Sequence, residues 1–420
     1  MVGTRIAKDM KKAVVFTLGC KVNECESDSL ITGLKERGYE VFDSLVEADL
    51  YIVNTCAVTS EAEKKSRQTA SRIYRLNKNA KIIFTGCACQ KESKHFLNKG
   101  ENVLVTGVFD KNKILSMLEE SGEKIAKETN EFEELLPVST LRSRAYVKVQ
   151  DGCDNFCSYC IIPYLRGRSR SRNPESILKE INGLSAYEVI INGINLSSYK
   201  FEGREFADLF EYLIDVKKRI RIGSLEVGVI NPRLLGNLKN LYDFAPHFHL
   251  SMQSGSNSVL KSMNRKYSRE QFIDKVNLIR QYFPSAGITT DIIVGFPTET
   301  EEDFLQTLSL VDEVKFSDIH AFCFSPRSGT VAYKMKDLPS EIKRDRLNRL
   351  LVKKQECKNA FIEKSLGKEL SFVPEYQKNG YTEGYSGNYL RVYVKGEVKG
   401  KKIRVRATSF YEDGVLCEII

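Results

Sequence analysis

Hydrophobic runs of strand length alternate with polar, helix-compatible stretches along the N-terminal part of the chain. Three of these runs, KAVVFTLGC, ADLYIVNTC and AKIIFTGC, are each followed by such a polar stretch. Strand-like runs that alternate with helical segments are typical of a parallel sheet covered by helices. The pattern therefore predicts an α/β domain over residues 1–138, which ends within the acidic connector LEESGEKIAKETNEFEELLPVST.

A second alternating region begins at Ala145. Its strand-like runs are AYVKVQ, YEVIIN, IRIGSLE, HFHLSMQ, ITTDIIVGF and DIHAFCFS. Helical segments such as NPESILKEINGL and SREQFIDKVNLIRQYF lie between them, and Ser268 is placed to cap the second of these. Six strand-helix units are fewer than the eight of a closed (β/α) barrel. We therefore expect a partial (β/α)6 barrel over residues 139–365, with its active site at the carboxyl ends of the strands.

Short β runs separated by glycine-containing turns follow a basic helical stretch, PSEIKRDRLNRLLVKKQECKNAFIEKSL. These runs, ELSFVPEY, YLRVYVK and KKIRVRATSF, lie within residues 366–420 and predict a small antiparallel β-barrel or sandwich. The predicted fold class is thus α/β with a small antiparallel β domain at the C-terminal end. A chain of 420 residues is long enough for three such domains.

Three cysteines stand just past the N-terminal strand-like runs. Cys20, Cys56 and Cys87 fall where each strand turns toward the next helix. Because these turns share the carboxyl edge of a parallel sheet, we expect the three thiols to meet at one point and to bind a metal cluster. Three unrelated buried thiols are the alternative, since free cysteine is often buried as a small hydrophobe. The shared edge favours the cluster.

The stretch DGCDNFCSYCIIPYLRGRSRSR contains a second trio, Cys153, Cys157 and Cys160, at C-x3-C-x2-C spacing. Three thiolates on a four-iron cluster leave one iron open, which can bind a small molecule and pass it an electron. A structural zinc site is the alternative, but it normally takes a fourth Cys or His ligand. The histidines of the chain all lie far away in sequence, at His95, His247, His249 and His320. The spacing therefore favours an iron-sulfur cluster.

The balance of charge and the lack of targeting features restrict the class of protein. The net charge is +9, from 64 Lys and Arg against 55 Asp and Glu, which favours a polyanionic partner. The sequence has no run of about 18 apolar residues and no signal-peptide block. Its eleven cysteines suit a reducing compartment. We expect a soluble cytoplasmic protein that does not associate with a membrane.

An alternating run of arginines follows the second trio, at Arg166, Arg168, Arg170 and Arg172. Guanidinium groups form charge-assisted pairs with phosphates and with carboxylates. Arg166 is nearest the trio in sequence and is expected to point inward, toward a bound cofactor. A solvated surface run is the alternative for the set.

Six motifs, in the order in which they occur, resemble those of the radical S-adenosylmethionine methylthiotransferase family. They are TLGCKVNECES, VNTCAVT, TGCACQ, CDNFCSYCIIPYLRGRSRSR, HLSMQSGSNSVLKSMNRKYS and DIIVGFPTETEEDF. The resemblance covers nearly the whole chain. It implies an N-terminal methylthiotransferase domain (1–138), a radical S-adenosylmethionine barrel (139–365) and a C-terminal TRAM domain (366–420), a small β-barrel that grips RNA.

The resemblance also implies two [4Fe-4S] clusters and S-adenosylmethionine as cofactors. Cys20, Cys56 and Cys87 would hold an auxiliary cluster, where one S-adenosylmethionine methylates an attached sulfur. A second S-adenosylmethionine would be cleaved at the cluster on Cys153, Cys157 and Cys160, and the resulting 5′-deoxyadenosyl radical prepares the substrate carbon. Cys25 and Cys89 stand near the auxiliary ligands in sequence. Cys20 and Cys87 are preferred because each follows a glycine.

Candidate contacts to S-adenosylmethionine come from the cysteine loop and from the strand ends of the barrel. They are Tyr159, Arg166, Asn195, Ser224, Glu226 and Gln253. Polar residues in turns also satisfy backbone groups, which is the structural alternative for the strand-end residues.

The identity of the substrate depends on the three residues after Cys20. Lys21, Val22 and Asn23 resemble the branch that methylthiolates C2 of N6-threonylcarbamoyladenosine at position 37 of tRNA. The isopentenyladenosine branch usually has Gln-Met-Asn there, and the ribosomal-protein branch has Pro-Lys-Asn. We expect a monomer that binds the tRNA anticodon stem-loop and takes electrons from a protein such as flavodoxin or ferredoxin. The alternatives are methylthiolation of isopentenyladenosine or of a ribosomal protein and, outside enzymes, an iron-sulfur or zinc RNA-binding module.

Overall fold

The computed structural model describes residues 10–136 and 143–420, which form two compact units. Unit 1 contains the described residues up to 136 together with Tyr164–Gly167, and unit 2 contains residues 143–163 and 168–420. The predicted boundary between residues 138 and 139 lies outside the described residues. Within the described ranges, no helix is long and apolar enough to cross a membrane.

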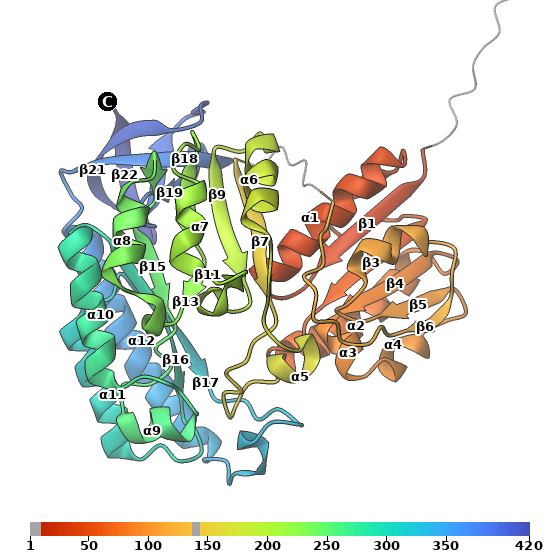
Figure 1. Ribbon diagram of the computed structural model, residues 1–420, viewed down its shortest axis with the longest axis horizontal. Helices are drawn as coiled ribbons and strands as arrows, with labels where there is room; N and C mark the ends of the chain where they lie inside the picture. Colours follow the sequence, from red (N-terminus) through yellow and green to blue (C-terminus); the bar gives the residue numbers. More distant parts are fainter. Residues whose placement is uncertain (1–9, 137–142) are drawn as a thin grey trace, which may run out of the picture. The chain divides into compact units, whose positions relative to one another are not determined.

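Unit 1 is built on a parallel sheet with strand order β2-β1-β3-β4-β5-β6 (Figure 1). Its strands are β1 (Lys12–Thr17), β2 (Glu40–Phe42), β3 (Leu50–Thr55), β4 (Lys81–Gly86), β5 (Val103–Thr106) and β6 (Gly122–Lys124). Its helical segments are α1 (Lys21–Glu36), α2 (Ser60–Leu76), α3 (Cys87–Lys91), α4 (Lys94–Leu97) and the 3-10 helix η1 (Lys111–Ser116). The three strands predicted from the sequence are β1, β3 and β4, which are neighbours in the sheet.

The order of these strands marks one end of the sheet as a ligand site. The chain passes from β1 to β2 on one side and then to β3 on the other side of β1. In doubly wound sheets such a reversal leaves a crevice at the carboxyl ends of the two strands, and ligands bind there. The carboxyl ends of β1 and β3 are therefore the expected binding edge.

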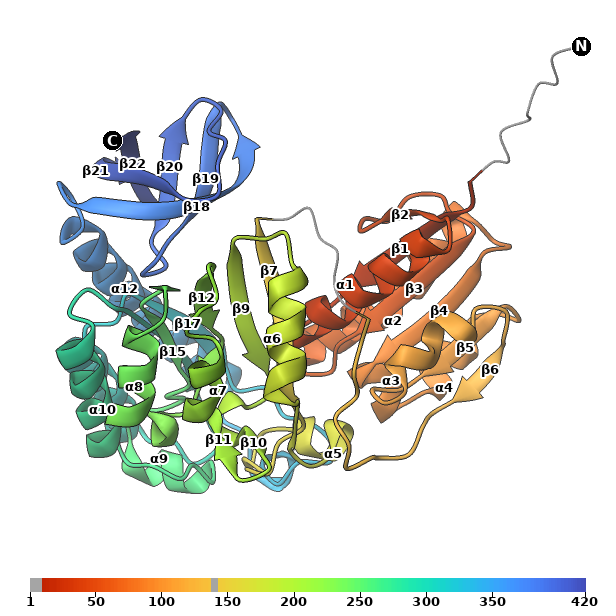
Figure 2. The same cartoon turned by 45° about the horizontal axis from the view of Figure 1, so that its top comes forward.

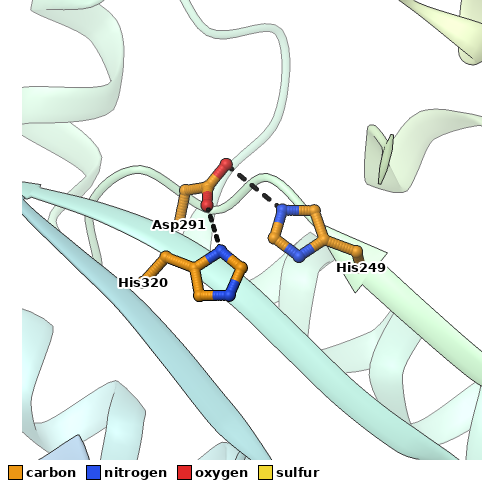
Figure 3. Close-up of side chains that lie close together, drawn as sticks. All are labelled: His249, Asp291 and His320. Carbon is orange, nitrogen blue, oxygen red and sulfur yellow. Dashed lines mark hydrogen bonds and ion pairs between the residues drawn. The ribbon is translucent and has the colours of Figure 1, made fainter. Parts of the chain in front are cut away.

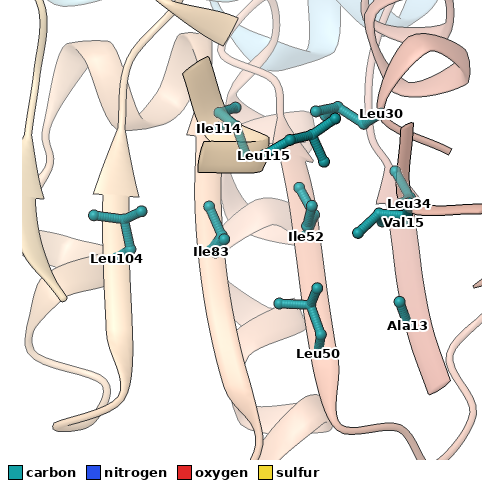
Figure 4. Close-up of a cluster of buried hydrophobic side chains, with 10 residues drawn as sticks. All are labelled: Ala13, Val15, Leu30, Leu34, Leu50, Ile52, Ile83, Leu104, Ile114 and Leu115. Carbon is teal, nitrogen blue, oxygen red and sulfur yellow. The ribbon is translucent and has the colours of Figure 1, made fainter. Parts of the chain in front are cut away.

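Apolar side chains fix α1 and η1 to one face of this sheet (Figure 4). Val15, Ile52 and Ile83 project from β1, β3 and β4, and they belong to one buried cluster with Leu34 of α1 and Leu115 of η1. Burying a side chain of this size contributes roughly 1.5–3 kcal/mol. The edge that carries the cysteines thus rests on a rigid frame.

Unit 2 begins with the expected open (β/α) barrel. The predicted runs correspond to β7 (Arg144–Asp151), β9 (Glu188–Gly193), β12 (Arg219–Ile222), β15 (His247–Leu250), β16 (Gly287–Val294) and β17 (Asp318–Cys323). Short strands β8 (Arg170–Ser171), β13 (Ser224–Leu225) and β14 (Asp243–Phe244) complete two sheets, β14-β12-β9-β7-β8 and β13-β15-β16-β17. Because β12 continues into β13 through Gly223, the chain itself joins the two sheets.

Helices cover the outside of these strands (Figure 2). They are α6 (Pro174–Gly183), α7 (Phe206–Tyr212), α8 (Pro232–Lys239), α10 (Arg269–Tyr282), α11 (Glu301–Val314) and α12 (Ser340–Glu363). Shorter elements lie in the connections: α5 (Ile162–Arg166), α9 (Asn257–Ser262), β10 (Lys200–Phe201), β11 (Arg204–Glu205), η2 (Leu196–Ser198), η3 (Val227–Val229) and η4 (Ala332–Lys334). Ser268 caps α10 as predicted, because its hydroxyl accepts a hydrogen bond from the Gln271 N–H.

The last strands close into a barrel in the order β18-β19-β20-β22-β21. They are β18 (Glu369–Lys378), β19 (Tyr381–Ser386), β20 (Arg391–Lys395), β21 (Ile403–Tyr411) and β22 (Gly414–Ile419). The predicted small β domain is thus a barrel and not a sandwich. The strand β19 escaped the sequence pattern because glycine and polar residues interrupt it. A Cβ on Gly384 would lie 2.0 Å from the carbonyl oxygen of Val373, so the close approach of β18 requires glycine.

Buried charged groups join this C-terminal barrel to the (β/α) barrel. The Arg221 guanidinium pairs with Glu188 at 2.7 Å and donates to the backbone oxygen of Ser386 at 2.9 Å. The ring of Tyr389 stacks on His247 with centroids 4.3 Å apart. Glu188 and His247 are the first residues of β9 and β15. The C-terminal barrel therefore closes the end of the (β/α) barrel opposite the carboxyl ends of its strands.

Candidate active site

The first site lies at the carboxyl ends of three adjacent strands of unit 1. Cys20 follows β1 as the N-cap of α1, Cys56 follows β3, and Cys87 opens α3 directly after β4. The structure thus places these thiols at one sheet edge, as the strand pattern predicted. We call Cys20, Cys56 and Cys87 the auxiliary trio.

Asparagine side chains hold the backbone around the auxiliary trio. Asn23 donates from Nδ2 to the backbone oxygen of Thr55 at 3.0 Å, and Asn54 donates to the backbone oxygen of Asn23 at 3.0 Å. These bonds tie the first turn of α1 to the end of β3. Gly19 has φ +117°, and a Cβ there would lie 2.8 Å from the Sγ of Cys56. Only glycine combines that conformation with such close packing.

Burial makes deprotonation of these thiols costly. It raises the pKa of Cys20 and raises that of Cys56 to about 11; Cys87 adds to both increases, and Cys20 adds to that of Cys56. A metal cluster binds thiolates, so its binding offsets the cost of burial and drives deprotonation.

Two buried cations stand beside the auxiliary trio. The side chain of Arg166 is 0% exposed, and its Nε donates to the Sγ of Cys87 at 3.4 Å. Its Nη1 pairs with Glu26 at 2.8 Å, and Glu26 also pairs with the buried Lys111. Two cations and one carboxylate leave a net positive charge near the sulfur atoms. Positive charge stabilises thiolates and so offsets part of the burial cost.

The position of Arg166 differs from the sequence expectation of a contact with S-adenosylmethionine. The segment Tyr164–Gly167 belongs to unit 1, and the guanidinium is bonded to Asn23, Glu26 and Cys87. The described contacts thus place Arg166 beside the auxiliary trio, and its contact with S-adenosylmethionine remains a prediction.

Two further cysteines lie close by in sequence. Cys89 is fully buried, its Sγ accepts a hydrogen bond from the Thr55 hydroxyl at 3.4 Å, and burial raises its pKa to about 12. Cys25 lies within α1 and is 3% exposed. The bond to Thr55 supports Cys87, rather than Cys89, as the third member of the trio.

The second site is the loop between β7 and α5, which contains Cys153, Cys157 and Cys160. We call these residues the loop trio. The chain turns sharply there, with positive φ at Gly152 (+71°) and Phe156 (+46°). The Cys160 N–H donates to the backbone oxygen of Cys157 at 2.9 Å. The turn thus brings cysteines with short spacing onto one side of the loop.

Donor groups from other segments approach the sulfur atoms of the loop trio. The Nδ2 of Asn195 lies 3.6 Å from the Sγ of Cys153, and the Nη1 of Arg265 lies 3.4 Å from the Sγ of Cys157. Hydrogen bonds to sulfur favour the thiolate over the thiol. These two residues therefore prepare the loop for a cluster that binds thiolates.

A carboxylate completes the surroundings of the loop trio. Glu226 accepts a hydrogen bond from Asn155 at 2.7 Å and pairs with Arg265 at 2.8 Å, both through Oε1. The strand-end residues Asn195 and Glu226, predicted as cofactor contacts, thus lie at the cysteine loop.

Burial also raises the pKa of thiols in the loop trio. It raises that of Cys153, and it raises that of Cys160 to about 12, with further increases from neighbouring thiols. Burial likewise raises the pKa of Tyr159 well above its ordinary value. The Tyr159 ring packs against a buried cluster that contains Phe296 and Phe324. This packing anchors the middle of the loop to the barrel core.

Comparison with protein families divides the chain in the same way. Residues 147–311 match the radical SAM superfamily, and residues 12–107 match a family described as uncharacterized protein family UPF0004. The loop trio lies in the first segment, and the auxiliary trio lies in the second.

Curated relatives extend over nearly the whole chain. Threonylcarbamoyladenosine tRNA methylthiotransferase MtaB of Bacillus subtilis is 36% identical over 98% of this chain and 97% of its own length. The protein of the same name from Thermotoga maritima is 38% identical over 97% of this chain and 96% of its own length. A tRNA-2-methylthio-N(6)-dimethylallyladenosine synthase of Staphylococcus haemolyticus is 36% identical over 93% of this chain and 82% of its own length.

The chain belongs to the radical S-adenosylmethionine tRNA methylthiotransferase family.

Solved structures share the fold of this methylthiotransferase at low sequence identity. The cobalamin-dependent radical enzyme OxsB has a TM-score of 0.53 at 13% identity, over 83% of this chain and 56% of its own. The radical methyltransferase TsrM from Kitasatospora setae has a TM-score of 0.53 at 13% identity, over 75% of each chain. These similarities concern the fold alone.

The thiols of either trio are not packed as closely as the ligands of a single zinc ion. A tetrahedral zinc site with Zn–S bonds of about 2.3 Å brings its sulfur atoms to ~3.8 Å from one another. Among the described residues, ligand atoms of three such side chains come within 4.8 Å of one another at His249, Asp291 and His320, and not at either trio. A four-iron cluster spreads its thiolates more widely. Each trio could therefore hold such a cluster with its three thiolates.

Two other predicted contacts of the methylthiotransferase lie at neighbouring strand ends. Ser224 opens β13 and is exposed, and its backbone pairs with His249. Gln253 follows β15 with φ +71° and bridges to Ile292. Their contact with S-adenosylmethionine remains a prediction.

The arginines after Arg166 divide between surface and interior. The Arg168 side chain is 63% exposed, as expected for a solvated run. Arg170 and Arg172 are buried, and they pair with Asp151 at 3.7 Å and with Glu180. Arg170 thus contacts the end of β7 next to the cysteine loop, and Arg172 contacts α6 through Ser176 and Glu180.

Three important residues were missed from the sequence. Arg265 lies in the motif HLSMQSGSNSVLKSMNRKYS, so the family resemblance offered a signal for it. Glu26 likewise lies in the motif TLGCKVNECES, whereas Lys111 gave no signal, because charged residues of helical segments are usually exposed. Their burial depends on the pairing with Arg166, which comes from a distant part of the chain.

Proposed function

We propose that this enzyme methylthiolates C2 of N6-threonylcarbamoyladenosine at position 37 of tRNA, using two [4Fe-4S] clusters and two S-adenosylmethionine molecules. The observation that carries the proposal is the pair of three-thiol sites, one in each unit, both at the carboxyl edge of a parallel sheet. A cluster on three protein thiolates keeps one iron open for a small molecule. Two such sites match a reaction that uses S-adenosylmethionine in two different ways.

The comparisons support threonylcarbamoyladenosine as the substrate. Identity alone does not separate the branches, since the threonylcarbamoyladenosine enzyme of Bacillus subtilis and the dimethylallyladenosine enzyme of Staphylococcus haemolyticus are both 36% identical to this chain. The alignment covers 97% of the first protein and 82% of the second. The more complete coverage of the threonylcarbamoyladenosine enzyme and the residues after Cys20 favour threonylcarbamoyladenosine as the substrate.

Of these residues, Lys21 is our candidate for a contact with the substrate. Val22 is 2% exposed and Asn23 is 1% exposed, whereas Lys21 is exposed. Asn23 donates a hydrogen bond to the backbone oxygen of Thr55 and accepts one from Arg166, so we give Asn23 a structural role. Lys21 stands beside Cys20 and offers a cation to a polar or anionic substrate group.

The residues of the chain have separate tasks in this proposal. When bound, the cluster on the loop trio supplies the electron for cleaving S-adenosylmethionine, and the cluster on the auxiliary trio supplies the attachment point for sulfur. Arg265 and Asn195 orient the loop trio through hydrogen bonds to sulfur. Glu226 is held next to the loop and presents a carboxylate to the hydroxyl or amino groups of S-adenosylmethionine.

We further propose that the C-terminal barrel is a TRAM domain that grips the anticodon stem-loop. Its buried bonds through Arg221 and Glu188 fix it to the catalytic barrel. A rigid connection lets RNA bound on one barrel be presented to the other at a fixed distance. Electrons would come from a carrier such as flavodoxin or ferredoxin.

Nucleoside mass spectrometry of tRNA tests the proposal. We would compare cells with this gene, without it, and with a Cys153→Ala/Cys157→Ala/Cys160→Ala variant, in a host that has no other enzyme of this specificity. The expected result is that 2-methylthio-N6-threonylcarbamoyladenosine is found with the intact gene alone, and its unthiolated precursor accumulates otherwise. Loss of the 2-methylthio isopentenyl nucleoside instead would refute the substrate. Purified, reduced protein that forms no 5′-deoxyadenosine would indicate a non-catalytic RNA-binding protein.

A further inference from the structure

Two histidines and an aspartate that belong to neither cysteine trio converge within unit 2. His249, Asp291 and His320 come from the neighbouring strands β15, β16 and β17, and both imidazoles turn toward the carboxylate (Figure 3). His249 Nε2 lies 3.2 Å from Asp291 Oδ2, and His320 Nδ1 lies 3.2 Å from Asp291 Oδ1. We call these three residues the His-Asp-His cluster.

The register of the strands brings this cluster together. Asp291 pairs with His320 across β16 and β17, and His249 pairs with Thr289, which is two residues before Asp291. Because residues two apart on a strand point to the same face, the three side chains share one face of the sheet. The adjacent Ile292 points to the opposite face and is 0% exposed, whereas the side chain of His320 is 50% exposed. The cluster therefore lies on the more open face.

Two imidazoles and one carboxylate form a donor set that binds divalent first-row metal ions. With metal–ligand bonds of about 2.1 Å, neighbouring ligand atoms lie about 3.0 Å apart in octahedral and about 3.4 Å apart in tetrahedral coordination. Both separations between an imidazole nitrogen and a carboxylate oxygen, 3.2 Å, fall between these values. One ligand atom from each of the three side chains lies within 4.8 Å of the others. Small rotations of the side chains are enough to surround an ion.

Thr289 supports the lone pair that a metal needs on His249. Its hydroxyl oxygen is 2.9 Å from His249 Nδ1 and 2.8 Å from His247 Nε2. When this hydroxyl donates its single proton to His247, it accepts a hydrogen bond from the Nδ1–H of His249, so the neutral ring of His249 has its lone pair on Nε2, toward Asp291. Histidines that bind metals usually donate their other ring N–H to an oxygen in this way. His249 thus has the partner expected of a metal ligand.

Protons on the two nitrogens that face Asp291 are the alternative to an ion. An N–H···O hydrogen bond also accounts for a separation of 3.2 Å. A metal ion displaces such a proton, since it binds the neutral imidazole through the lone pair of the nitrogen. The ion and the protons therefore compete for the same nitrogens, and direct metal analysis separates the two.

The cations next to the cluster already have carboxylate partners. Lys354 and Lys358 pair with Asp318 at 3.4 Å and 3.6 Å, and Lys358 also lies 3.5 Å from Asp413. The described ion pairs of Asp291 are those with the two histidines of the cluster. The negative charge of Asp291 therefore serves the space between the two imidazoles, where it would attract a cation.

We propose that the His-Asp-His cluster binds one divalent metal ion, with Zn²⁺ as the expected occupant. Imidazole suits Zn²⁺, whereas Mg²⁺ and Ca²⁺ prefer sites made of oxygen atoms alone. His249, Asp291 and His320 supply three ligands, which leaves a fourth tetrahedral position on the half-exposed side of His320. This site lies outside the two proposed iron-sulfur clusters and does not depend on the proposed function.

A bound ion would link three strands through their side chains. Among the described strands, β17 is the last in the order β13-β15-β16-β17, so a neighbouring strand holds it on one side alone. An ion with ligands on β15, β16 and β17 ties this edge strand to the rest of the sheet. Because a ligand that binds the folded state alone stabilises that state, zinc should slow hydrogen exchange of the β17 amides.

Metal analysis of the full-length protein tests the proposal. Cysteine thiols also bind zinc, so the iron-sulfur clusters are reconstituted first, and the protein is then equilibrated with Zn²⁺ at buffered free concentrations. The proteins are the wild type, His249→Gln, Asp291→Asn, His320→Gln and, as a matched control, His95→Gln, which changes an exposed histidine of unit 1. Elemental mass spectrometry gives zinc and iron per chain. Zinc on any residual thiols is the same in all five proteins, so the difference between them reports the His-Asp-His cluster.

We expect the wild type and His95→Gln to bind about one zinc per chain more than each of the three ligand variants. Loss of one ligand should weaken zinc binding by at least about 100-fold, because loss of a hydrogen-bond partner of a ligand already costs about 10- to 100-fold. Thr289→Val keeps all three ligands and should fall in that smaller range. Iron content should stay at the wild-type value in every variant, and zinc should slow exchange of the β17 amides in the wild type but not in His320→Gln.

Cobalt in place of zinc identifies the ligands. Oxidised four-iron clusters give no electron paramagnetic resonance signal, so the signal of bound Co²⁺ can be observed beside them. Pulsed measurements should detect nitrogen from two imidazoles in the wild type and from one in His320→Gln.

Two results would overturn the inference. If the wild type binds no more zinc than the three ligand variants, His249, Asp291 and His320 form a hydrogen-bonded group without a metal. If bound Co²⁺ shows no imidazole nitrogen, the ion lies elsewhere. Both measurements are independent of methylthiolation, so a protein that binds zinc as expected but makes no 2-methylthio nucleoside would contradict the proposed function and support the zinc site.

Discussion

The Nε of Arg166 donates to the Sγ of Cys87 at 3.4 Å, although Arg166 follows the loop trio in sequence. The short segment from Cys153 to Arg166 therefore contains the three proposed ligands of one cluster. It ends in the arginine whose positive charge lies beside the thiols of the other. Glu26 and Lys111 complete the charge balance, and all three charged side chains are at most 1% exposed. Formation of the auxiliary site depends on this segment as well as on the N-terminal sheet.

Replacing Arg166 by Met should destabilise unit 1. The change leaves Glu26 with Lys111 as its remaining cation, and breaking a buried pair on one side costs about 3–5 kcal/mol. Hydrogen exchange of the backbone amides of β1, β3 and β4, in the protein without clusters, would report the loss. The matched control is Arg168→Met, which removes an exposed pair with Asp154 and should change unit 2 by less than about 1 kcal/mol. If Arg166→Met destabilised unit 1 by no more than Arg168→Met destabilises unit 2, the buried role of Arg166 would be contradicted.

Iron content should identify the auxiliary ligands. The reconstituted wild type is expected to bind about eight irons per chain, as two four-iron clusters, and Cys56→Ala or Cys87→Ala should retain about four. Cys89→Ala should retain about eight, because Cys89 bonds to Thr55 and lies outside the trio. Iron and sulfide analysis, together with electron paramagnetic resonance of the reduced protein, measures the clusters in the wild type and in each variant. A loss of four irons in Cys89→Ala with none in Cys87→Ala would reverse the assignment.

Much of the fold could be read from the sequence because the strands are apolar runs of regular spacing. The runs that became β3 and β4 are almost wholly buried on both faces, so they stand out from the polar helices. The thiols at the strand ends followed from the same pattern. Strand β19 was missed because glycine and polar residues interrupt it.

Contacts between distant segments could not be read in this way. The burial of Arg166 depends on Glu26, the place of Arg265 depends on Glu226, and the grouping of His249, Asp291 and His320 (Figure 3) depends on the register of β15, β16 and β17. Local pattern predicts elements, whereas ion pairs between elements depend on how the chain packs.

Removing the charge of Arg265 should impair the loop trio without unfolding the barrel. In Arg265→Met the Sγ of Cys157 loses a donor at 3.4 Å and Glu226 loses its ionic partner at 2.8 Å. A thiolate with one charged hydrogen bond fewer is a stronger electron donor to iron, so the reduction potential of this cluster should fall. We expect 5′-deoxyadenosine formation to drop by at least about tenfold, since removing one hydrogen bond to a charged group costs about 1.5–3 kcal/mol.

Redox titration followed by electron paramagnetic resonance, in a variant without the auxiliary trio, separates this effect from loss of the cluster. Arg265→Lys serves as the conservative control, because it keeps the positive charge but replaces the guanidinium, whose Nη1 contacts Cys157 and Glu226 and whose Nη2 contacts the backbone oxygen of Ser251, by a single ammonium group. An unchanged potential together with an unchanged rate of cleavage would show that Arg265 has a structural role alone.

The join between the two barrels should depend on pH through Glu188. Burial alone would raise the pKa of this carboxyl, but Arg221, Arg144 and Arg219 outweigh burial and lower it below 4.5. A lowered pKa in the folded state means that the charge stabilises the fold above about pH 4.5 and that this contribution is lost as the pH falls through the folded value. Stability of unit 2 should therefore decline in acid more steeply than in a Glu188→Gln variant.

At pH 7 we expect Glu188→Gln to lower the free energy of unfolding of unit 2 by about 3 kcal/mol or more, since the change leaves buried arginines without their carboxylate. The difference from the wild type should shrink as the pH falls below about 4.5, because the unfolded wild type then takes up a proton that its folded state binds less readily. Thermal unfolding, with hydrogen exchange of β9 and β12 as the local probe, gives the comparison.

Glu369→Gln is the control, since the carboxylate of Glu369 is 50% exposed and pairs with Arg404 at the surface. This variant should leave the unfolding temperature unchanged at pH 7. A difference between the wild type and Glu188→Gln that is the same at pH 7 and pH 3 would show that Glu188 acts by shape and hydrogen bonding and not by its charge.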